Sequence, residues 1–151
     1  MNKKILIIGI CLLVVDFISK MIISSLMSID ESIKVIKNFL YITYVRNEGV
    51  AFSFLEGSLI FIILMSFIAI FFIIYYISHK KISKLESVGF GLILGGAFGN
   101  LIDRVFYGYV IDFIDVYIFG YDYPIFNVAD IGVVVGVFVI IINSFIEDRR
   151  K

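Results

Sequence analysis

Four long apolar stretches constrain this chain more than any other feature of its sequence. They cover residues 5–27, 59–77, 88–106 and 129–146. A helix rises about 1.5 Å per residue and the hydrocarbon core of a bilayer is about 30 Å thick, so each stretch is long enough to cross it. Hydrophobic residues make up 61% of the chain, well above their usual share in soluble domains. The sequence therefore predicts an all-α integral membrane protein with four transmembrane helices in a single domain, residues 1–151.

Charged residues are few and balanced, with 13 basic and 13 acidic side chains among 151 residues. A chain without net charge has no field that attracts nucleic acid. The only cysteine, Cys11, excludes an internal disulfide and a cysteine-cluster metal site. We therefore expect no nucleic-acid partner and no metal.

The positions of the basic residues predict the orientation of the spans, because Lys and Arg beside a span stay in the cytoplasm. Eight basic residues flank the ends of the spans that face one side: Lys3, Lys4, Lys80, Lys81, Lys84, Arg149, Arg150 and Lys151. Four lie on the opposite side: Lys34, Lys37, Arg46 and Arg104. Both termini are therefore expected in the cytoplasm, with the loops 28–58 and 107–128 outside.

The first outer loop, 28–58, has the composition of β-structure. Residues 34–46 are rich in β-branched and aromatic side chains, residues 47–49 supply a turn, and an apolar run resumes at 50–55. We expect a small β-hairpin or sheet here, lying on the outer face of the bundle. The second outer loop, 107–128, carries Tyr and Phe residues that suit the membrane interface.

Polar side chains within the spans converge on one depth. By helical rise, the outer third of the bilayer holds Asp16, Lys20, Asn100, Asp103, Arg104, Asn127 and Asp130. Ionisable residues in lipid are costly and usually mark a functional site. The sequence thus predicts that three spans bring polar groups together near the outer surface.

Each of these polar groups also has a structural interpretation. Asp16 and Lys20 are four residues apart and can form an ion pair on one helix face, either structural or supporting a site. Asp103 and Arg104 can mark the exit of the third span into water. Asp130, three residues after Asn127, resembles an acid in the first turn of a helix that Asn127 caps.

Glycines repeat at four-residue spacing in the third and fourth spans. The two sets are Gly91, Gly95 and Gly99, and Gly132 and Gly136. Small residues at this spacing let helix backbones approach closely. We therefore expect the third and fourth spans to pack on each other, which brings Asp130 towards the segment 108–117.

The outer side offers carboxylates but no cysteine or histidine. Nucleophilic Cys/His chemistry, a Ser–His pair and a histidine metal cluster are therefore excluded there. Two aspartates that share one proton can activate a water, because a like charge nearby raises one pKa. The residues alone predict acid–base hydrolysis at the outer membrane surface. They leave open which two aspartates face each other, among Asp16, Asp103, Asp112, Asp115 and Asp130.

Five ordered blocks of the sequence resemble the signature of the lipoprotein signal peptidases, also called signal peptidase II. They are VVDFISK (14–20), RNEGVAFSFL (46–55), GGAFGNLIDR (95–104), GYVIDFID (108–115) and FNVAD (126–130). The resemblance spans the whole chain. It implies a membrane aspartyl peptidase of the bacterial cytoplasmic (inner) membrane. Such an enzyme cuts the signal peptide from prolipoproteins just before a diacylglyceryl-modified cysteine, with membrane lipid around it and no cofactor.

The resemblance also implies which residues form the site. It places the catalytic dyad at Asp112 and Asp130, near the outer membrane surface. It places around them Asp16, Lys20, Asn47, Gly49, Asn100, Arg104, Asn127 and Ala129. Asp115 matches nothing that the family requires, and we expect it to be a surface charge.

Two other classes of function remain as alternatives. A four-span channel or transporter subunit would use Asp16, Lys20 and the outer aspartates as an ion or proton path. It is the weaker hypothesis, because the polar groups stop in the outer third of the bilayer. A structural assembly subunit explains the glycine faces but not the carboxylates.

Overall fold

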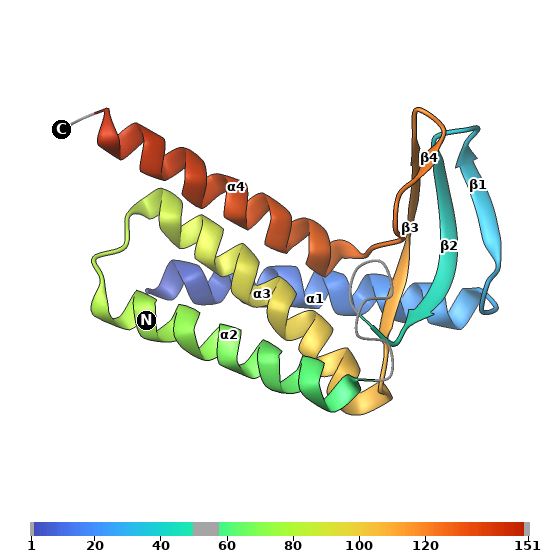
Figure 1. Ribbon diagram of the computed structural model, residues 1–151, viewed down its shortest axis with the longest axis horizontal. Coiled ribbons are helices and arrows are strands. Elements are labelled where there is room, and N and C mark those ends of the chain that lie inside the picture. Colours follow the sequence, from blue (N-terminus) through green and yellow to red (C-terminus); the bar gives the residue numbers. More distant parts are fainter. Residues whose placement is uncertain (1, 50–57, 150–151) are drawn as a thin grey trace.

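Four long helices lie side by side in the computed structural model, and a small sheet stands at one end of them (Figure 1). The structure describes residues 2–49 and 58–149. The elements in chain order are α1 (Lys3–Leu26), β1 (Ser32–Ile36), β2 (Leu40–Asn47), α2 (Leu59–His79), α3 (Lys84–Tyr107), β3 (Val110–Ile118), β4 (Tyr121–Asp122) and α4 (Val128–Asp148). All four helices are long and apolar enough to cross a membrane. Both the four predicted helices and the presence of a small sheet are confirmed.

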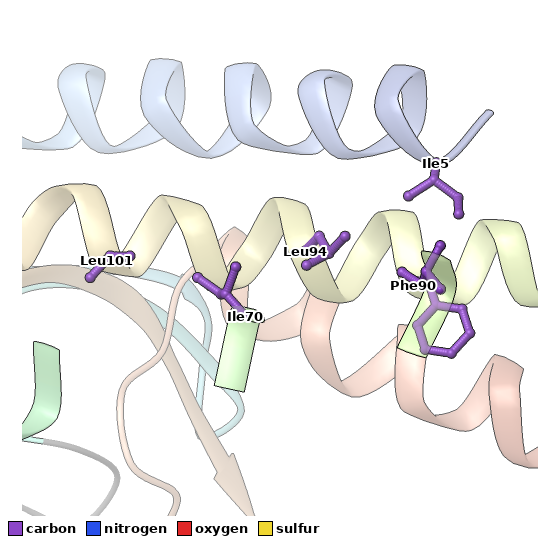
Figure 2. Close-up of a cluster of buried hydrophobic side chains, with 6 residues drawn as sticks. Ile5, Ile70, Phe90, Leu94 and Leu101 are labelled. Atoms are coloured by element: carbon purple, nitrogen blue, oxygen red, sulfur yellow. The ribbon is translucent and has the colours of Figure 1, made fainter. Parts of the chain in front are cut away.

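Helix α3 is central and contacts each of the other three helices. Buried apolar side chains from α1, α2 and α3 form one core: Ile5, Ile70, Ile77, Phe90, Leu94 and Leu101 (Figure 2). Many apolar side chains on α1, α2 and α4 point outward instead and stay exposed. This distribution is typical of a bundle whose outer surface meets lipid rather than water.

Glycines allow the backbone of α3 to lie close to both α1 and α4. A Cβ atom on Gly95 would lie 2.6 Å from the carbonyl oxygen of Gly9 in α1, and one on Gly89 would lie 2.8 Å from that of Gly136 in α4. The predicted contact between the third and fourth spans is therefore confirmed. The stripe that contains Gly91 and Gly95, however, packs against α1, whereas Gly89 and Gly96 face α4.

The sheet is antiparallel, with strand order β1-β2-β3-β4. Its first hairpin, β1–β2, turns at residues 37–39, and the chain bends again after β2, at residues 48–49, where the sequence predicted a turn. The predicted apolar run at 50–55 lies outside the described residues. The strands β3 and β4 occupy the second loop, where the sequence analysis expected none. The sheet therefore extends beyond the first loop, to which the sequence analysis assigned it.

Alternation along β3 decides where its two aspartates point. Residues three positions apart in a strand lie on opposite faces of a sheet. Asp112 faces a cleft that α3 and α4 also line, while Asp115 lies in a different hollow with Tyr41 and Tyr117. A second apolar cluster, of Met27, Tyr44, Ile111 and Phe113, joins the sheet to the region after α1.

Candidate active site

Asp112 sits at a point where two strands and a helix terminus meet. It lies on β3 opposite Val45 of β2, next to an irregularity in the pairing of these strands. Its side chain is almost fully buried, with 2% exposed. The amide group of Asn47 donates to Asp112 Oδ2 over 2.9 Å, and that of Asn127 donates to Oδ1 over 2.6 Å. Both carboxylate oxygens of Asp112 are therefore held by amide donors.

Asp130 lies in the first turn of α4 and forms a capping box with Asn127. The backbone N–H of Asp130 donates to Asn127 Oδ1 over 3.0 Å, and Asp130 Oδ2 accepts from the backbone N–H of Asn127 over 3.1 Å. The predicted N-cap is thus confirmed. The other carboxylate oxygen, Oδ1, accepts from Asn100 Nδ2 over 2.7 Å.

The amides of Asn100 and Asn127 connect the two carboxylates. Asn127 Nδ2 donates to Asn100 Oδ1 over 3.1 Å as well as to Asp112. Because Asn100 accepts through its oxygen, its nitrogen is directed to Asp130. A continuous set of hydrogen bonds therefore runs from Asp112 through Asn127 and Asn100 to Asp130.

Lys20 lies at the centre of a second polar group, which shares Asn100 with the first. Its Nζ lies 2.7 Å from Asp16 Oδ2 and 2.9 Å from Asp103 Oδ2, and it donates to Asn100 Oδ1 over 3.0 Å. Asp16 Oδ1 in turn accepts from the backbone N–H of Ala129 over 2.9 Å. The predicted pairing of Asp16 with Lys20 is confirmed, and it forms part of a larger network that joins α1, α3 and α4.

Asp103 does not mark the exit of α3 into water, which was one of the two interpretations that the sequence left open. It is buried, pairs with Lys20, and accepts weakly from the backbone N–H of Ile111 over 3.4 Å. The resemblance did not place it around the site. Its spacing is the signal that identifies it, because three residues after Asn100 lie almost one helical turn along the same face.

Arg104 is also buried and fixes the end of β2. Its Nη2 donates to the carbonyl oxygen of Gly49 over 2.8 Å, and its Nη1 donates to that of Asn100 over 3.3 Å. The backbone N–H of Gly49 donates to Asn47 Oδ1 over 3.0 Å, which directs the amide nitrogen of Asn47 towards Asp112. Arg104 thus orders the turn that carries one of the donors to Asp112.

Two adjoining clefts meet at Asp112. One, of about 390 Å³, lies between residues 45–49 and residues 121–125. The other, of about 380 Å³, extends to α3 and α4 and is lined by both Asp112 and Asp130, with Val133 and Val134 at its apolar side. A peptide bond and an attached apolar group can be accommodated in clefts of this size.

Burial sets the charge state of Asp112. It raises the pKa of this carboxyl from 3.8 to about 7, and the negative charge of Asp130 adds to the rise. The hydrogen bonds from Asn47 and Asn127 and the charge of Lys20 oppose it. An aspartate with such a pKa retains a proton at neutral pH in a large fraction of molecules, as a general acid requires.

Asp115 is buried, and our expectation of a surface charge was wrong. Only 5% of the residue is exposed, and its Oδ2 accepts from Thr43 Oγ1 over 2.6 Å. Because it lies on the opposite face of β3 from Asp112, it lines neither of the two clefts. Within residues 2–49 and 58–149, no three His, Cys, Asp or Glu side chains are grouped as metal ligands would be.

Comparison with known proteins finds one family and several solved structures that are similar to this chain. The profile of the family described as Signal peptidase (SPase) II matches residues 8–146. A bacterial membrane enzyme solved by the in meso method at 2.3 Å is 38% identical, with a TM-score of 0.91 over 100% of this chain and 93% of its own. A second, solved by the same method at 1.9 Å, is 39% identical, with a TM-score of 0.85 over 95% of this chain and 93% of its own.

Proposed function

Because this chain belongs to the signal peptidase II family, we propose that it removes signal peptides from bacterial prolipoproteins with Asp112 and Asp130 as its catalytic dyad. The family membership makes it a multi-pass membrane protease and does not favour a channel. One observation supports the aspartyl assignment above all others. The two carboxylates line one cleft and are connected through the amides of Asn100 and Asn127.

The geometry supports a division of labour between the two aspartates. Asp130 is the base: the helix N-terminus and the amide of Asn100 stabilise its negative charge. Asp112 is the acid, because its raised pKa keeps a proton on it. A water in the cleft gives one proton to Asp130 as its oxygen attacks the scissile carbonyl carbon, while Asp112 gives its proton to the carbonyl oxygen.

The second step breaks the peptide bond and restores the dyad. Asp130 returns its proton to the departing amine nitrogen, and Asp112 regains a proton from the tetrahedral intermediate as that intermediate collapses to a carboxylic acid. The products are the signal peptide with a new carboxyl terminus and a lipoprotein with a free amino group on its first residue. For this family member, that residue is the diacylglyceryl-modified cysteine.

We further place the site at the outer surface of the bacterial cytoplasmic membrane, within one membrane-embedded peptidase domain. The chain termini and the connection between α2 and α3 lie at the end of the bundle away from the sheet (Figure 1). Eight of the thirteen basic residues flank that end in sequence. The preference of Lys and Arg for the cytoplasm supports a cytoplasmic position for this end and an outer position for the sheet. Asp16, Lys20, Asn47, Gly49, Asn100, Arg104, Asn127 and Ala129 support the dyad.

The experiment that tests the dyad compares isosteric variants on a lipidated precursor peptide. Asn cannot cycle a proton, so Asp112→Asn and Asp130→Asn should each lower processing by roughly 10²–10⁴-fold, the range for losing a general acid or base. The double variant should be little worse than either single one. Processing at a nearly normal rate by either folded single variant would refute the assignment.

Asp115→Asn is the matched control for both variants. It makes the same chemical change as both variants, on the same strand as Asp112 but on the opposite face of the sheet, and the new amide oxygen still accepts from Thr43. We expect this variant to process the precursor normally. A peptide without the diacylglyceryl group should be left uncut by every form, which separates a lipoprotein signal peptidase from a general protease.

A further inference from the structure

Asp115 is buried on the face of the sheet opposite to Asp112, and one of its two carboxylate oxygens has no partner. Its Oδ2 accepts from Thr43, but its Oδ1 is buried and has no hydrogen-bond partner within residues 2–49 and 58–149. Folded proteins rarely leave a buried carboxylate oxygen without a donor, because nothing then replaces the water that it has lost. The described part of the chain thus leaves an acceptor that a bound group can fill.

The neighbours of Asp115 hold it as a negatively charged acceptor. The bond from Thr43 Oγ1 to Asp115 Oδ2 is 2.6 Å long, which is typical of a hydroxyl that donates to an ionised carboxylate. Because Thr43 has a single hydroxyl hydrogen, Ser32 Oγ is the donor in its 2.8 Å contact with Thr43 Oγ1. The hydrogens of both hydroxyl groups are therefore engaged, and neither is available to Asp115 Oδ1.

No cation of the described residues neutralises this charge. Both ion pairs found among them belong to Lys20. Lys34 shares the face of Asp115, but it is paired with Tyr41, which is in turn paired with Asp115. Two strand spacings, about 10 Å, therefore separate the backbones of Lys34 and Asp115. Arg46, farther along β2, is held by two tyrosines.

Two aromatic rings stand beside the unpartnered oxygen. The rings of Tyr41 and Tyr117 meet edge to face, with their centroids 5.4 Å apart. They border a hollow of about 650 Å³, the Asp115 hollow, which is lined by Ser32, Asn38, Tyr41, Asp115, Tyr117 and Gly120. The charge of Asp115 is the largest cause that raises the pKa of Tyr117, so the hollow has a negative potential. A carboxylate next to tyrosine rings is a combination that attracts organic cations.

The chemistry of the hollow distinguishes between kinds of cation. Asp115 Oδ1 needs a hydrogen to accept, and a quaternary ammonium group has none on its nitrogen. A calcium ion takes six to eight oxygen ligands, and the described residues contain no group of three His, Cys, Asp or Glu side chains. Water can donate a hydrogen but brings no charge. A primary ammonium group brings both a positive charge and three donors.

We propose that the Asp115 hollow binds a primary ammonium group, which donates to Asp115 Oδ1 and lies against the rings of Tyr41 and Tyr117. Two sources offer this group: a small soluble amine and the ethanolamine headgroup of a lipid. The hollow is separate from the two clefts that meet at Asp112. The site therefore exists whatever reaction those clefts carry out.

Nuclear magnetic resonance of fluorine in the full chain, labelled with 3-fluorotyrosine in detergent micelles, tests the site. Of the signals of the nine tyrosines, those of Tyr41 and Tyr117 are assigned by their loss in Tyr41→Phe and Tyr117→Phe. Ethanolamine hydrochloride should shift these two signals until they saturate and leave the other seven in place. Choline chloride and calcium chloride, at equal ionic strength, should bind at least about tenfold more weakly, because neither donates to Asp115.

Asp115→Asn keeps the size of the side chain and removes its charge, so it should weaken the binding of ethanolamine at least about tenfold. Lys34→Gln is the matched control, at an exposed position of the same face, and should bind ethanolamine at least as tightly. Unchanged signals from the other tyrosines show that each variant is folded. If Asp115→Asn does not fold, Tyr41→Leu, with Tyr117 as the reporter, must weaken binding at least about twofold.

Nanodiscs of phosphatidylcholine, with and without phosphatidylethanolamine, distinguish the two sources. If phosphatidylethanolamine shifts both signals and abolishes the response to free ethanolamine, the headgroup of the lipid is the ligand. If only free ethanolamine shifts them, the ligand is a soluble amine. Signals that do not respond to either source, that respond equally to choline, or that still respond in Asp115→Asn would overturn the proposal. A response seen only in Lys34→Gln would also overturn it, because Lys34 then fills the hollow itself.

Discussion

The surroundings of Asp112 act on its acidity in two opposite directions. Removal from water and the nearby Asp130 both favour the protonated form, while Asn47, Asn127 and Lys20 favour the ionised form. Removal from water is the largest of these effects, and the pKa of Asp112 rises to about 7. The amide donors keep it from rising further, so Asp112 can both give and regain a proton near neutral pH. A single buried residue thus acquires a function that its type alone does not specify.

The rate of processing should therefore depend on pH with a known sign. The proposed mechanism needs Asp112 protonated, and the protonated fraction falls as the pH rises through about 7. Above that value, kcat/KM should decline by roughly tenfold per pH unit. Asn47→Leu removes a hydrogen bond that lowers this pKa, so the decline should begin at a higher pH.

Thr43→Val is the control for this shift in the pH profile. It removes the donor to Asp115 on the opposite face of β3 and should leave the profile unchanged. An Asn47→Leu profile that coincides with that of the unaltered protein, or moves to lower pH, would contradict the role given to Asn47.

Lys20 is the only cation that the described residues place between Asp16 and Asp103. Lys20→Met leaves two buried carboxylates without their partner, and removing one member of a buried ion pair costs about 3–5 kcal/mol. We expect a clearly lower unfolding midpoint in detergent micelles. Lys37→Met, which changes an exposed residue of the first hairpin turn, should leave the midpoint where it was. If both variants unfold like the unaltered protein, Lys20 does not stabilise the bundle.

Among the elements, the helices were predictable and half of the sheet was not. A helix that crosses lipid needs about 20 apolar residues in a row, so its pattern is local and strong. The predicted spans differ from the observed helices by only a few residues at most ends. Strand β3 pairs with β2, about 65 residues earlier in the chain, as in the Asn47–Asp112 contact. Pairing between strands so far apart in the chain leaves little local signal in the sequence. The β-branched and aromatic residues of β3 could nevertheless have indicated a strand.

The candidate site, too, could be predicted only in part, because contacts between distant segments are not visible in the sequence. Helical rise was enough to predict that Asp16, Asn100 and Asp130 lie at one depth, because depth along a span is a one-dimensional quantity. Which side chains face each other depends on helix rotation and strand alternation. For that reason the sequence left open whether Asp103 marks the exit of its span or belongs to the polar group, and Asp115 was expected to be a surface charge. The glycine stripe of α3 was similarly recognised as a contact face without its partner helix being known.

Close packing of α3 against α1 leaves no room for a side chain at Gly95. A Cβ atom there would lie 2.6 Å from the carbonyl oxygen of Gly9, which is backbone and cannot turn away. Gly95→Leu should therefore separate the two helices and lower the free energy of unfolding by about 1–3 kcal/mol or more. Val105→Leu adds bulk to an exposed position of the same helix and is the control. Equal unfolding midpoints for both variants would show that this approach of the backbones is not needed.

At the scale of the whole molecule, the fold separates two ends. The sheet lies at one end, and the start of α1 and the end of α4 lie at the other (Figure 1). The polar network is at the end of the sheet, because Asp103 and Asn127 bond to residues of β3. Apart from charged residues in the helix turns at the end away from the sheet, the charges of the four helices lie in and around the network of Lys20. This asymmetry suits a protease that receives a membrane-anchored substrate from one surface only.

The orientation of these two ends is a prediction that impermeant thiol reagents can check in intact cells. Cys11 is the only cysteine, so a Cys11→Ser background gives each new cysteine a unique label. Lys34→Cys in β1 and Lys81→Cys between α2 and α3 are exposed positions at opposite ends of the bundle. If the basic residues hold their end in the cytoplasm, a membrane-impermeant maleimide added outside should label Lys34→Cys at once and Lys81→Cys only after the membrane is opened. The reverse pattern would place Asp112 and Asp130 on the cytoplasmic side, where a site for lipid-anchored precursors at the outer surface could not operate.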